Sequence, residues 1–181
     1  MEEFTYRWME PDEIERLGEI DRSEKILGHY NYQNGRLQKN TVDWDVPTWS
    51  KKGTDEYSLQ AQITFCREHL AKNGRMLGAF NIDQTLVGIG IIEPNIEPGI
   101  TQLAFLYTSN AFRRQGIAQQ LVANLSAEAK RLGNHSLYVS ATPSGSAVGF
   151  YLSQGFEVTD NPIPKLLELE PEDIQMLRKI A

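Results

Sequence analysis

Residues 100–118 read ITQLAFLYTSNAFRRQGIA, and this stretch decides the fold. Residues 100–108 are mostly aliphatic or aromatic, which predicts a β-strand. From Ile117 onward, apolar residues recur every three or four positions until Gly133, which predicts an α-helix that begins at a glycine. A strand-to-helix turn with a glycine leaves backbone N–H groups unpaired and pointing outward, where they bind anions. The sequence therefore predicts an anion site at Gly116.

The side chains around Gly116 narrow the kind of anion site. Arg113 and Arg114 add positive charge, and the small Ala118 keeps the second part of the turn open. A tight phosphate site needs several N–H bonds, because the helix dipole contributes only about 0.3–1 kcal/mol and each bond to a charged oxygen about 1.5–3 kcal/mol. No Gly-Lys-Ser/Thr follows, which excludes a Walker-type site. A Rossmann fingerprint also fails, because the turn follows a third strand and lacks a matching acidic residue.

Outward from this turn, the sequence predicts alternating strands and helices. Before it, we expect a strand over 4–9, a helix from Pro11, a helix from Thr54 or Asp55 to Leu70, and an antiparallel hairpin of strands 76–82 and 86–92. After it, we expect a strand over 136–141, a helix over 146–153, a strand over 156–159 and a parallel crossover. Residues 173–180 suit either a last strand or a helical turn.

Length and composition are those of one domain with an ordinary core. The chain has 181 residues, of which 40% are hydrophobic, so a core can form without a disulfide or metal. Its 18 Lys and Arg against 24 Asp and Glu give a net charge of −6, which argues against a general nucleic-acid binder. The single cysteine, Cys66, and three scattered histidines make no metal-spaced cluster, so we expect no metal.

Signals for export or membrane insertion are not found in the sequence. The first residues, MEEFTY, lack a basic region followed by an apolar run. No stretch approaches the roughly 20 apolar residues that a membrane-spanning helix needs. We therefore expect a soluble, cytoplasmic protein without membrane contact.

Two linked motifs stand out: Arg113-x-x-Gly116-x-Ala118, between a strand and a helix, and residues 144–156, SGSAVGFYLSQGF. Together they resemble the GNAT superfamily of N-acetyltransferases. The first is similar to that family's Gln/Arg-x-x-Gly-x-Gly/Ala signature, and the second is similar to its Asn-x-x-Ala-x-x-x-Tyr helix with the Gly-Phe that follows, at a typical separation. The resemblance covers about residues 76–160.

The resemblance implies a single α/β (α+β) domain over residues 1–181, with a mixed central sheet of about six to seven strands flanked by about four helices. It assigns residues 100–156 to an acetyl-CoA-binding core. The sequence departs from the family pattern at two positions. Ser144 stands where the family often has Asn, and Ala118 is the less common residue at the second glycine.

Carried onto this sequence, the resemblance implies that acetyl-CoA is the cosubstrate. Its pyrophosphate would lie on the amides of Arg114 to Gln119, and its pantetheine would run beside Leu106 to Thr108. The implied cofactor-binding residues are Leu106, Tyr107, Thr108, Arg113, Arg114, Gln115, Gly116, Ile117, Ala118, Gln119, Ser144 and Ala147.

Acetyl transfer to an amine requires two proton movements. An amine with a pKa near 10.4 is about 3.4 units from deprotonation at pH 7, which costs about 4.6 kcal/mol, so a base is expected. The resemblance implies that Tyr151 acts as general acid toward the thiol. Residues 100–108 contain no carboxylate, so Glu93 is the best candidate base, with His29, Asp43 and Asp45 as alternatives and a water relay also open.

Residues 28–53 have poor periodicity and many aromatic residues, and we interpret them as an ordered acceptor-side flap that includes a small hairpin at Asn34-Gly35. Aromatic rings beside carboxylates suit a cationic amine. The candidate acceptor-binding residues are Tyr30, Tyr32, Asp43, Trp44 and Asp45. The alternative is that these aromatics form a satellite core under a long connection.

The sequence thus predicts an acetyl-CoA-dependent N-acetyltransferase that acts on a primary amine of a small molecule, peptide or protein. A non-catalytic acyl-CoA-binding regulatory module is the main alternative, and a flavin or nucleotide-binding domain is a third. The expected partners are acetyl-CoA and an amine acceptor, with a homodimer left open.

Overall fold

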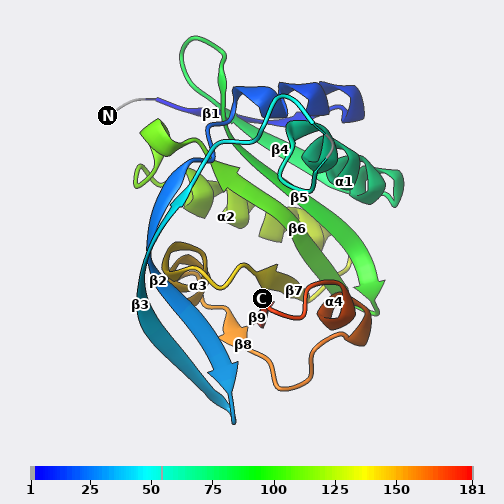
Figure 1. Ribbon diagram of the computed structural model, residues 1–181. Helices are drawn as coiled ribbons and strands as arrows, with labels where there is room; N and C mark the ends of the chain where they lie inside the picture. The colour runs from blue at the N-terminus through cyan, green and yellow to red at the C-terminus, as the bar shows by residue number, and fades with distance from the viewer. Residues whose placement is uncertain (1–2, 54, 181) are drawn as a thin grey trace.

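The computed structural model describes residues 3–53 and 55–180, and its centre is a mixed sheet of seven strands (Figure 1). The strands lie in the order β1-β4-β5-β6-β7-β9-β8. Their bounds are Thr5–Met9 (β1), Arg75–Phe80 (β4), Leu86–Glu97 (β5), Ile100–Thr108 (β6), Ser136–Ala141 (β7), Ile174–Lys179 (β9) and Glu157–Val158 (β8). Only β6 and β7 pair in parallel among these neighbours. The predicted α/β fold is confirmed.

Helices cover both faces of the sheet. The described residues form the α-helices Leu59–Ala71 (α1), Ile117–Arg131 (α2), Gly145–Ser153 (α3) and Pro164–Leu169 (α4), and the 3-10 helices Pro11–Glu19 (η1) and Asn110–Phe112 (η2). Ile14 of η1 and Ile63 of α1 belong to one buried cluster, whereas Leu121 of α2 and Val148 of α3 belong to another. The sheet separates these two clusters, and we call its two sides the α1 face and the α2 face.

Close packing of α2 depends on two glycines in β5. A Cβ atom at Gly90 would lie 2.5 Å from Leu125 Cδ1, and one at Gly88 would lie 2.6 Å from Ile117 Cγ2. A side chain at either position would therefore force these α2 side chains to shift. The two glycines thus allow α2 to pack closely against β5.

Most predicted elements are found near their expected bounds. β6 occupies the predicted residues, α2 ends before Gly133, and β4 and β5 form the predicted antiparallel hairpin. The parallel crossover is confirmed by the pairing of β6 with β7. Residues 174–179 form a strand rather than a helical turn, because β9 pairs with both β7 and β8.

The structure refines the helix predictions. The helix predicted from Pro11 is confirmed, and it is of the 3-10 type. The helix α1 begins at Leu59, because the Ser58 side chain accepts the Ala61 N–H at 3.2 Å and caps it. Of the two predicted caps, Asp55 instead accepts the Tyr57 N–H at 2.9 Å, and Thr54 lies outside the described residues. Helix α4 was not predicted, since its few residues are too short to show a helical period.

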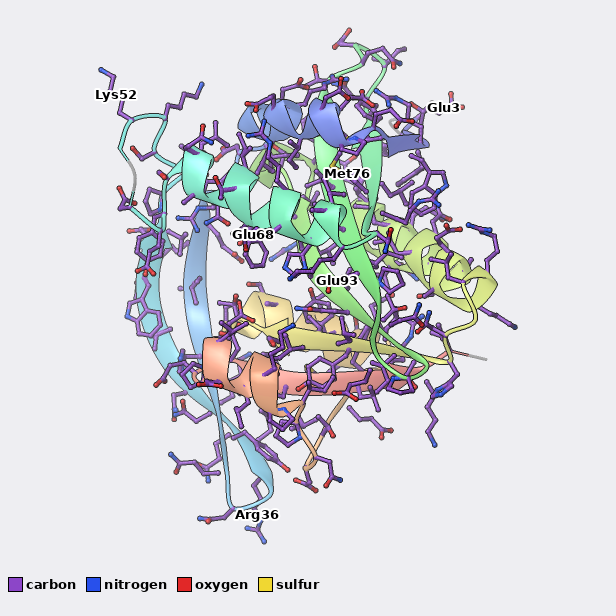
Figure 2. The ribbon with its side chains drawn as sticks, turned by 90° about the vertical axis from the view of Figure 1, so that its right-hand side faces the viewer. Glu3, Arg36, Lys52, Glu68, Met76 and Glu93 are labelled. Carbon is purple, nitrogen blue, oxygen red and sulfur yellow. The ribbon has the colours of Figure 1, made fainter. Side chains whose placement is uncertain are left out.

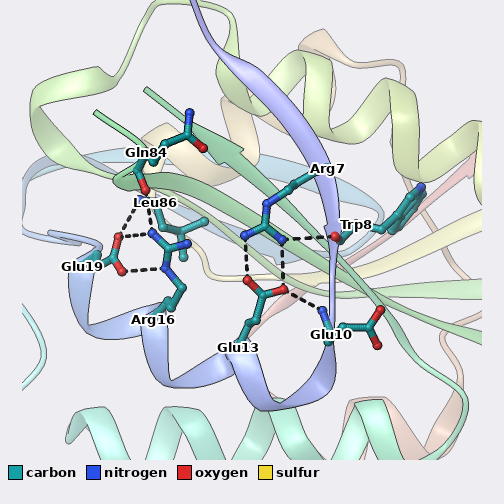
Figure 3. A network of polar contacts seen from close by, with 8 residues as sticks. All are labelled: Arg7, Trp8, Glu10, Glu13, Arg16, Glu19, Gln84 and Leu86. Carbon is teal, nitrogen blue, oxygen red and sulfur yellow. Dashed lines mark hydrogen bonds and ion pairs between the residues drawn. The ribbon is translucent and has the colours of Figure 1, made fainter. Parts of the chain in front are cut away.

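The 3-10 helix η1 is held by a chain of ion pairs and backbone bonds (Figure 3). Arg7 of β1 donates to both carboxylate oxygens of Glu13, at 2.6 and 2.9 Å, and the Glu10 N–H donates to Glu13 at 3.0 Å. At the other end, Glu19 pairs with Arg16 and accepts the Leu86 N–H at 2.6 Å. These contacts fix η1 to β1 and to the start of β5.

The strands Glu24–Gln33 (β2) and Arg36–Val46 (β3) form a separate two-stranded sheet. Its predicted Asn34-Gly35 turn is confirmed, because both residues have positive φ, 53° and 72°. The hairpin is longer than predicted and begins before residue 28. Figure 2 shows Arg36 at its tip, away from the central sheet. Nearer its base it contacts the main body, where the Tyr30 N–H donates to the Pro143 carbonyl at 2.7 Å.

The feature that positions the site is the divergence of β6 and β7. Their pairing covers only Ile100–Gln102 on β6 and Ser136–Tyr138 on β7. Beyond it, β6 continues to Thr108 and β7 to Ala141 without pairing to each other. A register shift between Ile91 and Ile92 on β5 leaves Ala104 as an extra residue of β6 just past the last pair, and such bulges bend a strand. The sheet is therefore open between the ends of these two strands.

Candidate active site

A cavity of about 1550 Å³ occupies the opening between β6 and β7. Residues 103–108 of β6 form one wall, and the end of β7 with α3 forms the opposite wall. The start of α2 lines the cavity from the α2 face. Phe65 of α1 lines it from the α1 face, and residues 169–173 also line it. The cavity thus reaches elements of both faces of the sheet. Pockets for one small ligand usually measure about 300–1,000 Å³, so this cavity has room for two ligands together.

The start of α2 presents free backbone donors to this cavity. Gly116 is its N-cap residue, with φ 82°, and Arg114 also has a positive φ of 61°. Gln120 is the first residue whose amide donates back into the turn, to the Gly116 carbonyl at 3.0 Å. The amides from Gly116 to Gln119 therefore have no acceptor within the helix. A Cβ at Gly116 would meet nothing within 4 Å, so the space beside these amides is open.

The two arginines beside Gly116 differ in what they contact. Arg113 donates to the carbonyls of Thr108, at 3.2 Å, and Arg22, at 3.0 Å, and lies 3.6 Å from a Glu24 oxygen. Its guanidinium is therefore used to tie the turn to β6. Arg114 is exposed, lines the cavity and has no ion pair with any residue in 3–53 or 55–180. Of the two, only Arg114 has a guanidinium that is free to meet an anion.

The second motif contributes one side of the cavity through α3. Ser144 caps this helix, since its Oγ accepts the Ala147 N–H at 3.1 Å, and both residues line the cavity. The β2 strand passes beside this cap, where His29 bridges to Ser144. The serine therefore serves as a helix cap, which explains how it can replace the asparagine of the family pattern.

Tyr151 of α3 lies on the cavity wall that faces β6. It is 8% exposed, and its ring packs against Phe150 and Phe156. Burial raises the pKa of Tyr151, and the nearby Tyr107 and Asp173 raise it further. The tyrosine is therefore protonated at neutral pH and can donate a hydrogen bond into the cavity.

Three carboxylates, Glu170, Glu172 and Asp173, line the cavity between α4 and β9. Burial raises the pKa of Asp173 to about 7, and the neighbouring Glu170 and Glu172 raise it as well. Burial also raises the pKa of Glu170, while a Ser140 hydrogen bond and His69 of α1 oppose the shift. The influence of His69 places this part of the cavity on the α1 face.

Glu93, the base expected from the sequence, is not among the residues that line this cavity. It is 8% exposed, its Oε2 lies 2.5 Å from His69 Nδ1, and Lys72 Nζ lies 3.8 Å from the same oxygen. Figure 2 shows Glu93 beside α1, the helix that carries His69. Its carboxylate is thus engaged in a buried pair that joins β5 to α1.

Of the five expected acceptor residues, only Asp45 lines the cavity. Asp43 pairs with Lys25 at 2.8 Å, and Trp44 is half-exposed and packs edge-on against His29. Tyr32 hydrogen-bonds Asp160 and lines a smaller cavity of about 370 Å³. Tyr30 packs against the core cluster that includes Val148 and Tyr151. The hairpin is therefore partly a support for α3.

Most of the expected cofactor-binding residues line the cavity, unlike the expected acceptor residues. Within the cavity lining are Leu106, Tyr107, Thr108, Arg113, Arg114, Gly116, Ile117, Ala118, Gln119, Ser144 and Ala147. Gln115 is exposed and does not line the cavity. These residues come from one contiguous stretch, which runs from the end of β6 into α2, and from the start of α3. Their spacing along the sequence could therefore be recognised.

Sequence reasoning missed several residues that the fold brings to the cavity. Besides the carboxylates before β9, these include Arg22, Glu56, Tyr57 and Phe65. The acidic run 170–173, EPED, directly before the last strand was the one visible signal. The others lie in segments where nothing in the local pattern marks them.

The described part of the chain has neither a metal-binding cluster nor a membrane-spanning helix. No group of three or more His, Cys, Asp or Glu is arranged there to hold a metal ion. None of the helices in residues 3–53 and 55–180 has the length and apolar character needed to cross a membrane. Cys66 is fully buried, and burial raises the pKa of its thiol to about 12.

Comparison with known proteins identifies the family to which this fold belongs. A sequence model described as the acetyltransferase (GNAT) domain matches residues 45–165, which is more than half of the chain. The chain therefore belongs to the GNAT acetyltransferase family and is an N-acetyltransferase. No curated protein matches it significantly in sequence.

Solved structures of this fold are similar over the whole chain. Nourseothricin acetyltransferase aligns with a TM-score of 0.73 at 14% identity, covering 98% of this chain and 99% of that chain. A Bacillus anthracis (strain Ames) protein, provisionally named a streptothricin acetyltransferase, was solved in complex with acetyl coenzyme A. It aligns with a TM-score of 0.69 at 14% identity, covering 97% of this chain and 96% of that chain. PaiA N-acetyltransferase of Thermoplasma acidophilum, in complex with coenzyme A, aligns with a TM-score of 0.62 at 18% identity, covering 98% of this chain and 99% of that chain. At these identities the likeness is one of fold.

Proposed function

We propose that this N-acetyltransferase carries the acetyl group of acetyl-CoA directly to a primary amine of a small molecule, or of a peptide or protein, within a ternary complex. The observation that carries this proposal is the cavity between β6 and β7, which holds free backbone amides at one region and carboxylates at another. Its volume suits two ligands bound at once, as direct transfer requires.

The cofactor is proposed to bind along the α2 face. The amides of Gly116 to Gln119 would hold the pyrophosphate, and the exposed Arg114 would add charge. Each N–H bond to a charged oxygen contributes about 1.5–3 kcal/mol. Pantetheine would then run between Leu106–Thr108 and the start of α3, because β6 has unpaired backbone groups on that side. This path ends beside Tyr151.

The chemistry at that point is acyl transfer by a neutral amine. The nitrogen attacks the thioester carbonyl carbon, a C–N bond forms, and the C–S bond breaks. A thiol of pKa about 8.5 is a fair leaving group, whereas an ordinary tyrosine of pKa about 10 gives up its proton to the thiolate uphill. Because burial raises the pKa of Tyr151, we propose that it acts by a hydrogen bond or by concerted transfer to sulfur.

The acceptor is proposed to be cationic in its free form. Glu170, Glu172 and Asp173 line the cavity near α1, and Asp45 and Glu56 line it from β3 and the following loop. This excess of negative charge attracts an ammonium group. Two of the solved structures are named for acetylation of nourseothricin and streptothricin, so these compounds belong in the first acceptor panel.

Other features remain predictions. Residues 28–53 are predicted to have an acceptor-side role, and residues 100–156 are predicted to contact the cofactor. A cytoplasmic location, activity without a metal and a possible homodimer are also predictions. The hairpin role now rests mainly on Asp45, because the other expected acceptor residues lie outside the main cavity.

The test is a panel of amines incubated with acetyl-CoA. We expect thiol release together with a product heavier by one acetyl group, strongest for compounds with an accessible primary amine. Product mass is essential, because thiol release alone also reports hydrolysis. Binding of acetyl-CoA with no acetylated product from small molecules, peptides or proteins would contradict the proposal and favour an acyl-CoA-binding module.

A further inference from the structure

Asp173 occupies a distinctive place at the open end of the sheet. It directly precedes β9, whose first residue, Ile174, pairs with Ala141, the last residue of β7. This register places Asp173 at the point where β7 ends and the gap to β6 is open. The residue is partly buried and lines the same cavity as Tyr107 and Tyr151.

Tyr151 lines the same cavity as Asp173. The side chain is more than nine-tenths buried and lines the cavity. No hydrogen bond to a residue in 3–53 or 55–180 occupies its hydroxyl, and that oxygen is not one of the buried atoms left without a partner, so it is open to the cavity. An open hydroxyl can donate a hydrogen bond to a molecule bound there. Asp173 acts electrostatically on this same tyrosine.

We propose that the Asp173 carboxylate accepts the proton from the acceptor's ammonium group, which makes Asp173 the base of the reaction. This inference rests on the proposed function and deepens it. An acceptor nitrogen that attacks the thioester beside Tyr151 lies within the part of the cavity that Asp173 also lines. Glu93, in contrast, lies in the pair with His69 and outside the lining residues.

The protons balance in the following way. The ammonium gives one proton to the Asp173 carboxylate, which later releases it to solvent. The neutral nitrogen attacks the carbonyl carbon, the C–S bond breaks, and the Tyr151 hydroxyl protonates the thiolate sulfur. The nitrogen's second proton restores the tyrosine hydroxyl. The sum is an ammonium and acetyl-CoA giving an amide, free CoA and one proton.

The surroundings of Asp173 suit this role, because a general base works best when its pKa is near the working pH. Burial, Glu170 and Glu172 raise the pKa of Asp173 to about 7. Tyr107 of β6 and Tyr151 of α3 line the same cavity, and Asp173 acts electrostatically on both. The other charged or titratable groups around it are His69 of α1, acting on Glu170, Arg22, acting on Tyr107, and Tyr32 with Asp160 in the smaller cavity that Asp173 also lines.

The experiment compares pH profiles of kcat with the best acceptor for the wild type, Asp173→Asn and Glu168→Gln. Glu168 is exposed, lies on the adjacent α4 and does not line the cavity, so its variant controls for loss of negative charge nearby. For Asp173→Asn we expect kcat at pH 7 to fall about 10²–10⁴-fold. The wild-type profile should rise with an apparent pKa near 7, and this limb should be lost in Asp173→Asn only.

Separate measurements distinguish the ways in which the inference can fail. Calorimetric acetyl-CoA affinity within twofold of wild type shows that Asp173→Asn is folded, and Asp173→Glu should restore part of kcat. If Asp173→Asn kept both the wild-type kcat and the rise of kcat with pH near 7, the inference would be overturned while the proposed function stood. A higher acceptor KM in Asp173→Asn with this pH dependence intact would also overturn the inference, because Asp173 would then only attract the cationic acceptor. No acetylated amine from the wild type would overturn the proposed function as well.

Discussion

The two regions of the cavity are built in different ways. At the start of α2, the donors are backbone amides from one contiguous turn around Gly116. Around Tyr151, the working groups are side chains from α3, β6 and the segment before β9, which are far apart in sequence. In the proposed function, the first region would hold a group common to every acyl-CoA, for which main-chain geometry suffices. The second would have to suit one acceptor and one proton path, which requires particular side chains.

The largest expected effect is at the reacting end. Tyr151→Phe removes the hydroxyl that we place beside the leaving sulfur, so kcat should fall about 10²–10⁴-fold with acetyl-CoA affinity little changed. Tyr6→Phe on β1, at the far edge of the sheet, should leave kcat unchanged. Steady-state kinetics with both variants test this. Equal kcat values for Tyr151→Phe and wild type would show that this region needs no acid.

The second prediction addresses the amide region. Gly116→Val places a branched side chain at φ 82° in the open space beside the amides, so acetyl-CoA should bind about 10–100-fold more weakly. Gly35→Val is the matched control, because Gly35 has φ 72° and open space but lies at the hairpin tip. Calorimetry should show weaker binding for Gly116→Val alone. Equal losses in both variants would indicate general backbone strain.

The third prediction separates the sequence-predicted base from the acceptor region. Glu93→Ala leaves buried His69 without its partner, so the free energy of unfolding should fall by about 1–3 kcal/mol. Glu68→Ala, exposed on the same helix as His69, should change it little (Figure 2). Denaturant unfolding measures both. A Glu93→Ala variant of unchanged stability that loses the pH limb near 7 would return the base to Glu93.

The smallest expected effect concerns pH and stability. The folded-state pKa of Asp173, about 7, lies above its ordinary value of 3.8, so the folded state holds a proton that the unfolded state has lost between these pH values. Stability should therefore fall as pH rises through this window. Asp173→Asn should be more stable than wild type at pH 8, on the order of 1 kcal/mol, with the gain shrinking toward pH 5. A gain independent of pH would contradict this account.

The comparison also explains which predictions from sequence held. Strand 100–108, the turn at Gly116 and helix α2 were predictable because their signals are local: a hydrophobic run, a glycine and a repeat of three or four residues. The Asn34-Gly35 turn was readable for the same reason. Local signals did not reveal how far β2 and β3 extend. Their apolar residues do not alternate regularly, and the two strands are defined by their pairing with each other. Helix α4 was missed because it is too short to show a period.

The sequence alone determined the family motifs, the strand-turn-helix unit and the residues that present amides to an anion, because these depend on neighbouring residues and backbone geometry. Only the tertiary structure decided which carboxylates line the cavity. Strand β9 inserts between β7 and β8, and this pairing carries Asp173 to the end of β7, opposite Tyr107 and near Tyr151. The antiparallel pairing and packing of β5 instead join Glu93 to His69. Proton transfer depends on distance in space, and long-range strand pairing sets that distance.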